Sequence, residues 1–204
     1  MTRLTTILLA LGCIAGPLRA QTSVSGQALG AAVRTPATNL QSGQVTLPSG
    51  GGFVAADVDA LSAPEVRVDA LTTMTSGATD IQTSTAQSTA HLENVNVLNG
   101  LITAETVIAA TSSWVSGAAG RNAEGSSFTN LVVNGVPLGS GDYLPAPNTR
   151  VELPGVGYAV LNEQITSGVS GITVNMIHVV LQNALTGLTT GEIIVASASS
   201  SVGS

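Results

Sequence analysis

The sequence predicts an all-β protein, and three observations lead to this prediction. Hydrophobic residues make up 44% of the 204 residues, yet only 2% are aromatic and 9% are charged. Small and β-branched residues dominate, which suits closely packed strands better than helices rich in Leu, Glu, Lys and Arg. Apolar and polar residues also alternate over several short segments that turn-forming residues separate, as expected for strands with one buried face.

The first 20 residues have the layout of a secretory signal peptide. Arg3 supplies a positive start, an apolar run spans residues 4–16, and Pro17 precedes the small residue Ala20. The run is too short to cross a bilayer, which takes about 20 residues. We therefore expect cleavage after Ala20 and a secreted, extracellular or periplasmic protein. The alternatives are a buried core helix and a lipoprotein signal that uses Cys13.

Cleavage would also remove the one cysteine of the chain. The mature protein would keep four arginines and no lysine against 12 acidic residues. A disulfide scaffold and a zinc ribbon are therefore excluded, and a chain without a basic surface is not expected to bind nucleic acid. About 184 residues suffice for one stable core without disulfides. No later segment is apolar over a membrane-spanning length.

The mature chain divides into a polar, turn-rich segment over residues 21–52 and a domain over residues 53–204. The first segment is expected to be partly extended and partly loop. In the domain, alternation predicts strands over residues 54–60 and 65–70, joined by a turn at residues 62–64. Further elements are expected as a Thr- and Ser-rich strand or mobile connection at 71–90, and two apolar runs within 92–111 joined by Asn99–Gly100. A helix over 103–110 is an alternative for the second run, although its β-branched residues favour a strand.

The C-terminal half alternates short strands with loops. Loops rich in glycine, serine or proline are expected over residues 117–127 and 139–149. Strands are expected over residues 128–133 (followed by the hairpin dipeptide Asn134–Gly135), 151–153, 157–165, 172–181 and 192–199. The last two are expected to form an antiparallel hairpin.

Roughly ten short strands with this spacing are typical of an antiparallel β-sandwich or jelly roll in a single domain. A β-solenoid is the alternative, because strands of small residues can stack in coils. The sequence has no repeat of fixed period, which disfavours the solenoid.

Four motifs occur in a characteristic order after residue 94. They are LVVNG at 131–135, LPG at 153–155, LNEQ at 161–164 and ITVN at 172–175. In this order they resemble the bacterial choice-of-anchor P family, whose secreted domain carries a C-terminal cell-surface anchor that varies between members. The resemblance implies export and display on, or release from, a bacterial cell, and it implies no defined catalytic residues. No sorting motif, apolar helix or basic tail follows the last strand, so we do not expect cell-surface anchoring.

Few residues are candidates for chemistry. His91 and Glu93 lie two apart, so on a strand both would face one side and could bind a metal, although no third ligand is close in sequence. His178 is in phase with Val174 and Met176, which predicts a half-buried, hydrogen-bonded strand histidine. No nucleophile elbow, phosphate-binding loop or dinucleotide fingerprint is present. We therefore expect no enzymatic activity.

Calcium is the one cofactor that the sequence raises. Asp57 and Asp59 would share one face of a strand, and Asp142 lies in a glycine-rich loop. No loop has the dense spacing of oxygen ligands found in calcium sites, so a solvated acidic face is the preferred interpretation.

A polar cluster of Asn162, Glu163 and Gln164 follows an apolar run. In a functional interpretation, Glu163 contacts a ligand or substrate. In the structural interpretation, which we prefer, these side chains satisfy backbone groups at a strand end or bulge.

These observations predict a non-catalytic, secreted bacterial protein with a structural or interaction role, outside the cell or on its surface. One alternative is a carbohydrate-binding module with Trp114 as a glycan contact, although few aromatic rings are available for stacking on sugars. Another is a self-assembling surface or filament component, because exposed strand edges can pair between chains. The expected partners are cell-surface or extracellular-matrix components or further copies of the chain.

Overall fold

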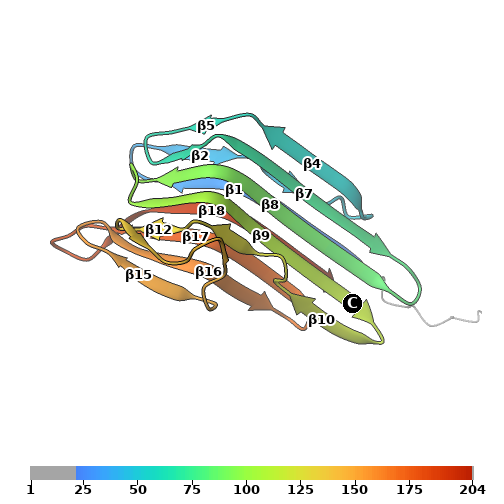
Figure 1. The fold of residues 1–204 in the computed structure, drawn as a ribbon. Coiled ribbons are helices and arrows are strands. Elements are labelled where there is room, and N and C mark those ends of the chain that lie inside the picture. The colour runs from blue at the N-terminus through green and yellow to red at the C-terminus, as the bar shows by residue number, and fades with distance from the viewer. Residues whose placement is uncertain (1–21, 204) are drawn as a thin grey trace, which may run out of the picture.

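The computed structural model describes residues 22–203, which fold into two antiparallel sheets without a helix (Figure 1). The first sheet contains, in order, β15 (Thr149–Leu153), β16 (Gly157–Ser167), β17 (Gly171–Gln182), β18 (Thr189–Gly203), β1 (Ser23–Arg34) and β2 (Asn39–Ser42), with β3 (Val45–Thr46) also paired to β1.

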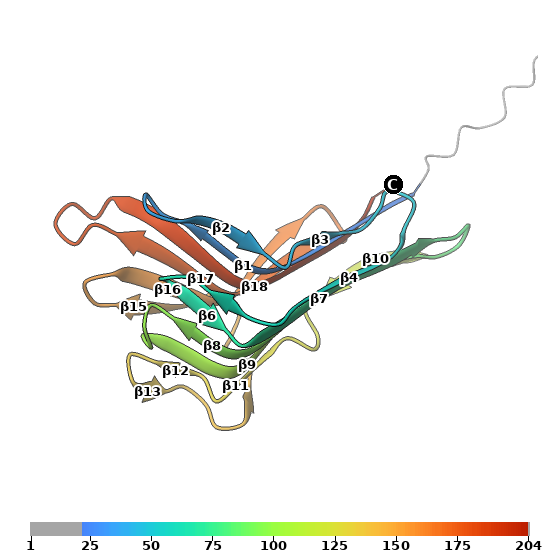
Figure 2. The same cartoon turned by 90° about the horizontal axis from the view of Figure 1, so that it is seen from above.

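The second sheet is built around the long hairpin of β8 (Ser84–Val97) and β9 (Ile102–Ser116). On the β8 side lie β7 (Ala70–Thr79), β4 (Gly52–Val58), β6 (Val66–Val68) and β5 (Leu61–Ser62). On the β9 side lie β10 (Ala118–Asn122), β11 (Ser127–Thr129), β12 (Val132–Val133), β13 (Val136–Pro137) and β14 (Asp142–Tyr143). The two sheets form separate layers in Figure 2.

The sandwich prediction is confirmed. Every strand pair in the described residues is antiparallel, whereas the coils of a solenoid would stack in parallel. Strand β9 is extended throughout, which excludes the helix considered for residues 103–110. Asn134 and Gly135 form a two-residue hairpin turn, and their φ values of 52° and 73° are those that a type I′ turn requires.

The segment over residues 21–52, which was expected to be polar and turn-rich, contributes β1, β2 and β3 to the first sheet. Strand β1 lies between β18 and β2, and Ala28, Ala31 and Val33 are fully buried in the core. The position 52/53 is therefore not a boundary between structural units.

The signal-peptide prediction for residues 1–20 lies outside the described residues. Residues 71–90, for which a mobile connection was one interpretation, form β7 and much of β8, and the predicted loop over 117–127 contains β10.

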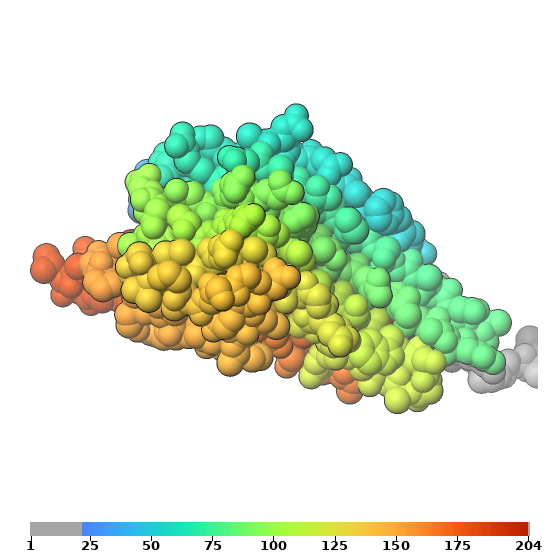
Figure 3. All heavy atoms as spheres, in the orientation of Figure 1, coloured from blue at the N-terminus to red at the C-terminus, as the bar shows by residue number. Residues whose placement is uncertain are grey.

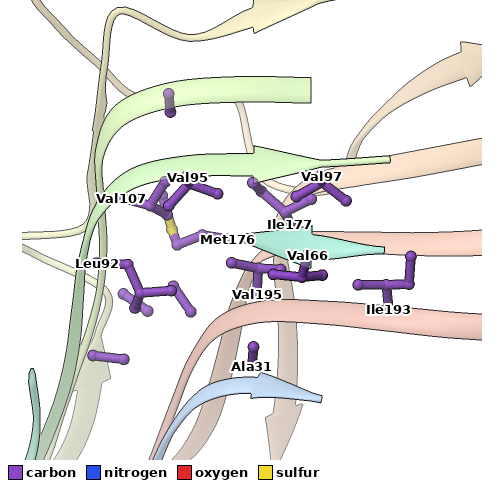
Figure 4. Close-up of a cluster of buried hydrophobic side chains, with 14 of the residues drawn as sticks. Ala31, Val66, Leu92, Val95, Val97, Val107, Met176, Ile177, Ile193 and Val195 are labelled. Atoms are coloured by element: carbon purple, nitrogen blue, oxygen red, sulfur yellow. The ribbon is translucent and has the colours of Figure 1, made fainter. Parts of the chain in front are cut away.

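Large apolar side chains fill one half of the space between the sheets. Figure 4 shows this cluster, in which strands of the second sheet face β17 and β18 of the first. Its labelled members include Leu92, Val95, Val97, Val107, Met176, Ile177, Ile193 and Val195, all of which are buried. Burial of such side chains contributes roughly 1.5–3 kcal/mol each.

The alternation of buried and exposed side chains reverses once in each long strand of the first sheet. The reversal falls on one cross-strand row formed by Gly30, Ala196, Met176 and Asn162. Ala196 and Asn162 have positive φ values of 54° and 49°. As a result Val174 and Met176 point inward but His178 points outward, so the predicted common phase of these three residues is wrong.

Small and hydroxyl side chains fill the other half of the interior together with a small apolar cluster of Val24, Leu47, Ala86 and Val202. Thr75 and Ser88 share a hydrogen bond of 2.9 Å, and Ser88 Oγ donates across the sandwich to the Ser199 carbonyl at 2.7 Å. A side chain on Gly26 would overlap Thr75 Oγ1. The sheets therefore approach closely here, and hydrogen bonds as well as apolar contacts join them.

Candidate functional site

A group of titratable side chains lies on the outer face of the first sheet. His178 on β17 stands between Glu163 on β16 and Glu192 on β18. His178 Nδ1 lies 3.0 Å from Glu163 Oε2, and Nε2 lies 3.7 Å from Glu192 Oε2. The side chains of His178 and Glu163 are each 18% exposed. The prediction of a half-buried, hydrogen-bonded histidine is confirmed.

Hydrogen bonds extend this group across four strands. Asn175 Nδ2 donates to Glu163 Oε2, and Ser197 Oγ donates to Asn175 Oδ1, both at 2.6 Å. At the other end, Arg34 donates to Glu192 at 2.6 Å. We call these six residues the histidine network: Arg34, Glu163, Asn175, His178, Glu192 and Ser197.

The histidine network lacks the arrangement of a nucleophilic site. Such a site needs a nucleophile within hydrogen-bond reach of the base. The one hydroxyl of the network, that of Ser197, donates to Asn175 and makes no hydrogen bond to His178. Four shallow hollows of the described surface lie at turns and strand ends, and none of the four is lined by His178. The geometry is that of a cross-strand polar network.

The structure separates the three residues of the predicted polar cluster. Asn162 is fully buried, donates to the Pro145 carbonyl at 2.8 Å and accepts from Gln164 Nε2 at 3.0 Å. The Gln164 backbone N–H donates to Asn148 Oδ1 at 2.9 Å. Asn162 and Gln164 thus hold the connection before β15 against the sheet, whereas Glu163 joins the histidine network. The side chain of Asn162 bonds a backbone group, as the structural interpretation expects, whereas those of Glu163 and Gln164 bond other side chains.

Trp114 lies on the outer face of the second sheet. It pairs with Thr85 on β8 and with Gly120 on β10, and a side chain on Gly120 would overlap the indole ring. The ring therefore lies over the glycine backbone, a contact that stabilises glycine at a sheet margin. Trp114 is half-buried, so part of the indole reaches solvent. The neighbouring outward positions hold the uncharged side chains of Gln87 and Ser112.

The candidate metal ligands do not assemble. Asp57 accepts a hydrogen bond from Thr72 at 2.7 Å, and Asp142 accepts one from Thr129 at 2.8 Å. Asp59 is exposed after the end of β4. Within residues 22–203, no three His, Asp or Glu side chains are arranged to hold a metal ion, and His178 turns its two ring nitrogens toward different carboxylates.

His91 and Glu93 share the outward side of β8, as their spacing predicts. Opposite them on β7 stand Thr72 and Ala70, neither of which is a strong metal ligand. The pair therefore has no third ligand on the neighbouring strand.

A contact that the sequence analysis missed lies on β15 and β16. The Arg150 guanidinium carbon stands 3.6 Å from the centre of the Tyr158 ring, a cation–π contact. A hydrogen bond from Arg150 to the Glu152 carboxylate, 2.7 Å long, raises the pKa of this arginine. The signal in the sequence for the Arg150–Glu152 pair was the Arg-x-Glu spacing, which places both side chains on the same face of a strand.

No protein-family model matches the chain, and neither a curated protein nor a solved structure is similar to it. The described residues also contain no helix that is long and apolar enough to cross a membrane. The functional argument therefore depends on the contacts of this chain's own residues.

Proposed function

We propose that this chain is a non-catalytic, exported bacterial protein with a structural or interaction role, related to the choice-of-anchor P family. The histidine network is the observation that supports this role most directly. Its histidine and its three charged side chains are engaged in contacts that tie β1, β16, β17 and β18 together. No nucleophile is positioned beside them.

The interior supports the same role. Hydroxyl groups of Ser88 and Ser113 bridge the two sheets by hydrogen bonds, and the rest of the interior is closely packed. Such an interior gives a rigid body without disulfides, which suits an exported structural domain. The signal peptide that the sequence predicts over residues 1–20 is the reason to propose a location outside the cytoplasm.

Secretion and turnover assays test this proposal. The full chain is expressed in a bacterial host, the cell fractions are separated, and the mature N-terminus is sequenced. We expect a product that begins at Gln21 in the periplasm or medium and that does not hydrolyse polysaccharides, peptides or esters. Turnover that is lost in His178→Ala and also in Glu163→Gln, with both variants folded, would instead establish an enzyme.

A second candidate is carbohydrate binding through Trp114. The observation that favours it is the indole lying along the sheet surface beside the uncharged Thr85, Gln87 and Ser112. Sugar rings stack on such aromatic faces, and amides and hydroxyls orient them by hydrogen bonds. Within this proposal, Trp114 is the glycan contact and the ligand is a neutral oligosaccharide.

Glycan arrays followed by titration calorimetry test this candidate. If Trp114 stacks on a sugar, Trp114→Ala should weaken binding by at least about tenfold, which corresponds to roughly 1.4 kcal/mol. Trp114→Phe keeps an aromatic face and should retain most of the affinity. If the ligand lies beside the indole, Gln87→Ala should lower the glycan affinity more than Glu93→Ala, a control on the same strand. An array without any bound glycan contradicts the candidate.

A further inference from the structure

Strand β4 forms an unpaired margin of the second sheet. Among residues 22–203 its only strand partner is β7, in an uninterrupted register from Gly52↔Gly77 to Val58↔Leu71. In Figure 1 it lies at the outer rim of the molecule, and Figure 3 shows this rim at the surface. An edge of this kind presents a row of backbone N–H and C=O groups that a further strand can pair with.

β4 carries none of the features that commonly block pairing at an edge. It has no proline, lysine, arginine or bulge over its seven residues. Its single charged side chain, Asp57, is held toward β7 by the hydrogen bond from Thr72. Phe53 is 66% exposed, and Met74 on the adjacent strand is also exposed, so apolar surface accompanies the free backbone groups.

The other long edges of the described residues are protected. β15 carries Arg150 and Glu152 on its exposed side and is flanked by Pro147 and Pro154. Just before the start of β15, the Asn148 side chain accepts a hydrogen bond from the Gln164 backbone N–H and so covers the part of β16 that β15 does not pair with. On β10, Arg121 donates to the Gly168 carbonyl in the turn between β16 and β17. Charges, prolines and covering side chains are the usual means of preventing edge pairing, and of these β4 has one charge, that of Asp57, which is engaged by Thr72.

We propose that β4 pairs with β4 of a second copy, in antiparallel orientation about a twofold axis. The axis is placed at Val54 or Ala55, near the centre of the strand. Inward-facing residues of one β4 then lie opposite inward-facing residues of the other, and outward-facing residues lie opposite outward-facing ones. The two second sheets then join into one continuous sheet. This inference deepens the proposed structural role, because it names the partner as another copy of the chain.

The dimer is expected to be weak. Seven paired residues extend over roughly 23 Å, and pairing of edges alone buries less than the roughly 1,200 Å² of a stable interface. A dissociation constant between about 10 μM and 1 mM is therefore expected. Both copies use the same strand, β4, about the twofold axis, so the assembly closes at two copies. Pairing through β4 by itself therefore does not produce a filament.

Sedimentation equilibrium of the mature chain tests the proposal. We expect the average mass to rise toward that of two chains as the concentration approaches about 1 mM. Ala55→Lys should abolish this rise, because it places a charge on the exposed side of the paired edge. Thr89→Lys is the matched control, since Thr89 lies in the same cross-strand row and on the same face but two strands inward. It should leave the dimer intact.

Hydrogen exchange locates the interface independently. Amides of β4 should become at least about tenfold more protected at high than at low concentration, while those of β10 and β15 should not change. A chain that stays monomeric at about 1 mM overturns the proposal. So does a dimer that persists in Ala55→Lys and Phe53→Lys with both variants folded. Either result leaves the secretion and turnover assays, and hence the proposed role, unaffected.

Discussion

At the scale of single residues, left-handed backbone conformations control which way side chains point. Asn162 has a φ of 49°, a conformation that costs other L-residues roughly 1–2 kcal/mol but that asparagine tolerates. The residue also buries its amide and uses it for two hydrogen bonds. One asparagine therefore reverses the alternation of β16 and fastens the connection that precedes β15.

Two substitutions separate these contributions of Asn162. Asn162→Gly keeps the conformation but loses the amide, which should lower the free energy of unfolding by about 1–3 kcal/mol. Asn162→Ala also loses the conformational preference and should cost about 1 kcal/mol more. Urea denaturation measures both values. Equal stability of the two variants would mean that the backbone conformation contributes nothing.

At the scale of elements, the second half of the sandwich depends on hydroxyl groups. Ser113 Oγ donates to the Ser170 carbonyl at 2.6 Å and lies 2.8 Å from Ser200 Oγ. All three residues are buried. These contacts join β9 to β18 and to the turn before β17, beside the small apolar cluster of Val24, Leu47, Ala86 and Val202.

Ser113→Ala should therefore be destabilising by about 1–3 kcal/mol, because it leaves buried polar partners unsatisfied. Ser112→Ala is the matched control, since the neighbouring side chain points outward on the same strand. It should change stability by less than about 0.5 kcal/mol. Thermal unfolding followed by circular dichroism distinguishes the two, and similar melting temperatures would contradict a role for the buried hydroxyl.

At the scale of the whole molecule, the N-terminal strand is part of the sandwich. β1 pairs with β18 over eleven residue pairs and also with β2 and β3. Its removal would expose the edge of β18 and open the core at Ala28, Ala31 and Val33.

A truncated chain that begins at Phe53 should therefore fail to fold. A chain that begins at Gln21 is the control and should fold, because every described strand remains. Dispersed amide resonances in a two-dimensional NMR spectrum would report folding in each case. A well-dispersed spectrum of the shorter chain would show that residues 53–203 form a domain without β1.

Much of the fold could be predicted from local pattern. The hairpin of β17 and β18 and the turn at Asn134–Gly135 were expected because alternation and turn dipeptides are short-range signals. The strand count was too low, since 18 strands are present in the described residues against the roughly ten expected. Short strands such as β5 and β12 depend on a neighbour to pair with, and two or three residues carry no period of their own.

The candidate site was predicted only in part. His178 and Glu163 were each singled out, but their contact depends on the register of β16 against β17, in which Glu163 pairs with Asn175. The reversal at Asn162 and Met176 breaks the period-two rule, so alternation assigned His178 to the same face as Val174. A prediction from alternation assumes a regular strand. Where a strand becomes irregular depends on contacts with segments that are distant in the sequence.

The strand-forming composition, the turns, the lack of cysteine after residue 20 and the sparse set of chemically active groups can all be read from the sequence. These are properties of single residues and of near neighbours along the chain. Only the tertiary structure decided that β1 is central, that His178 meets two carboxylates, and that β4 is left at a free edge. Each of these depends on which distant strands lie side by side, because sheet pairing joins residues that no local pattern connects.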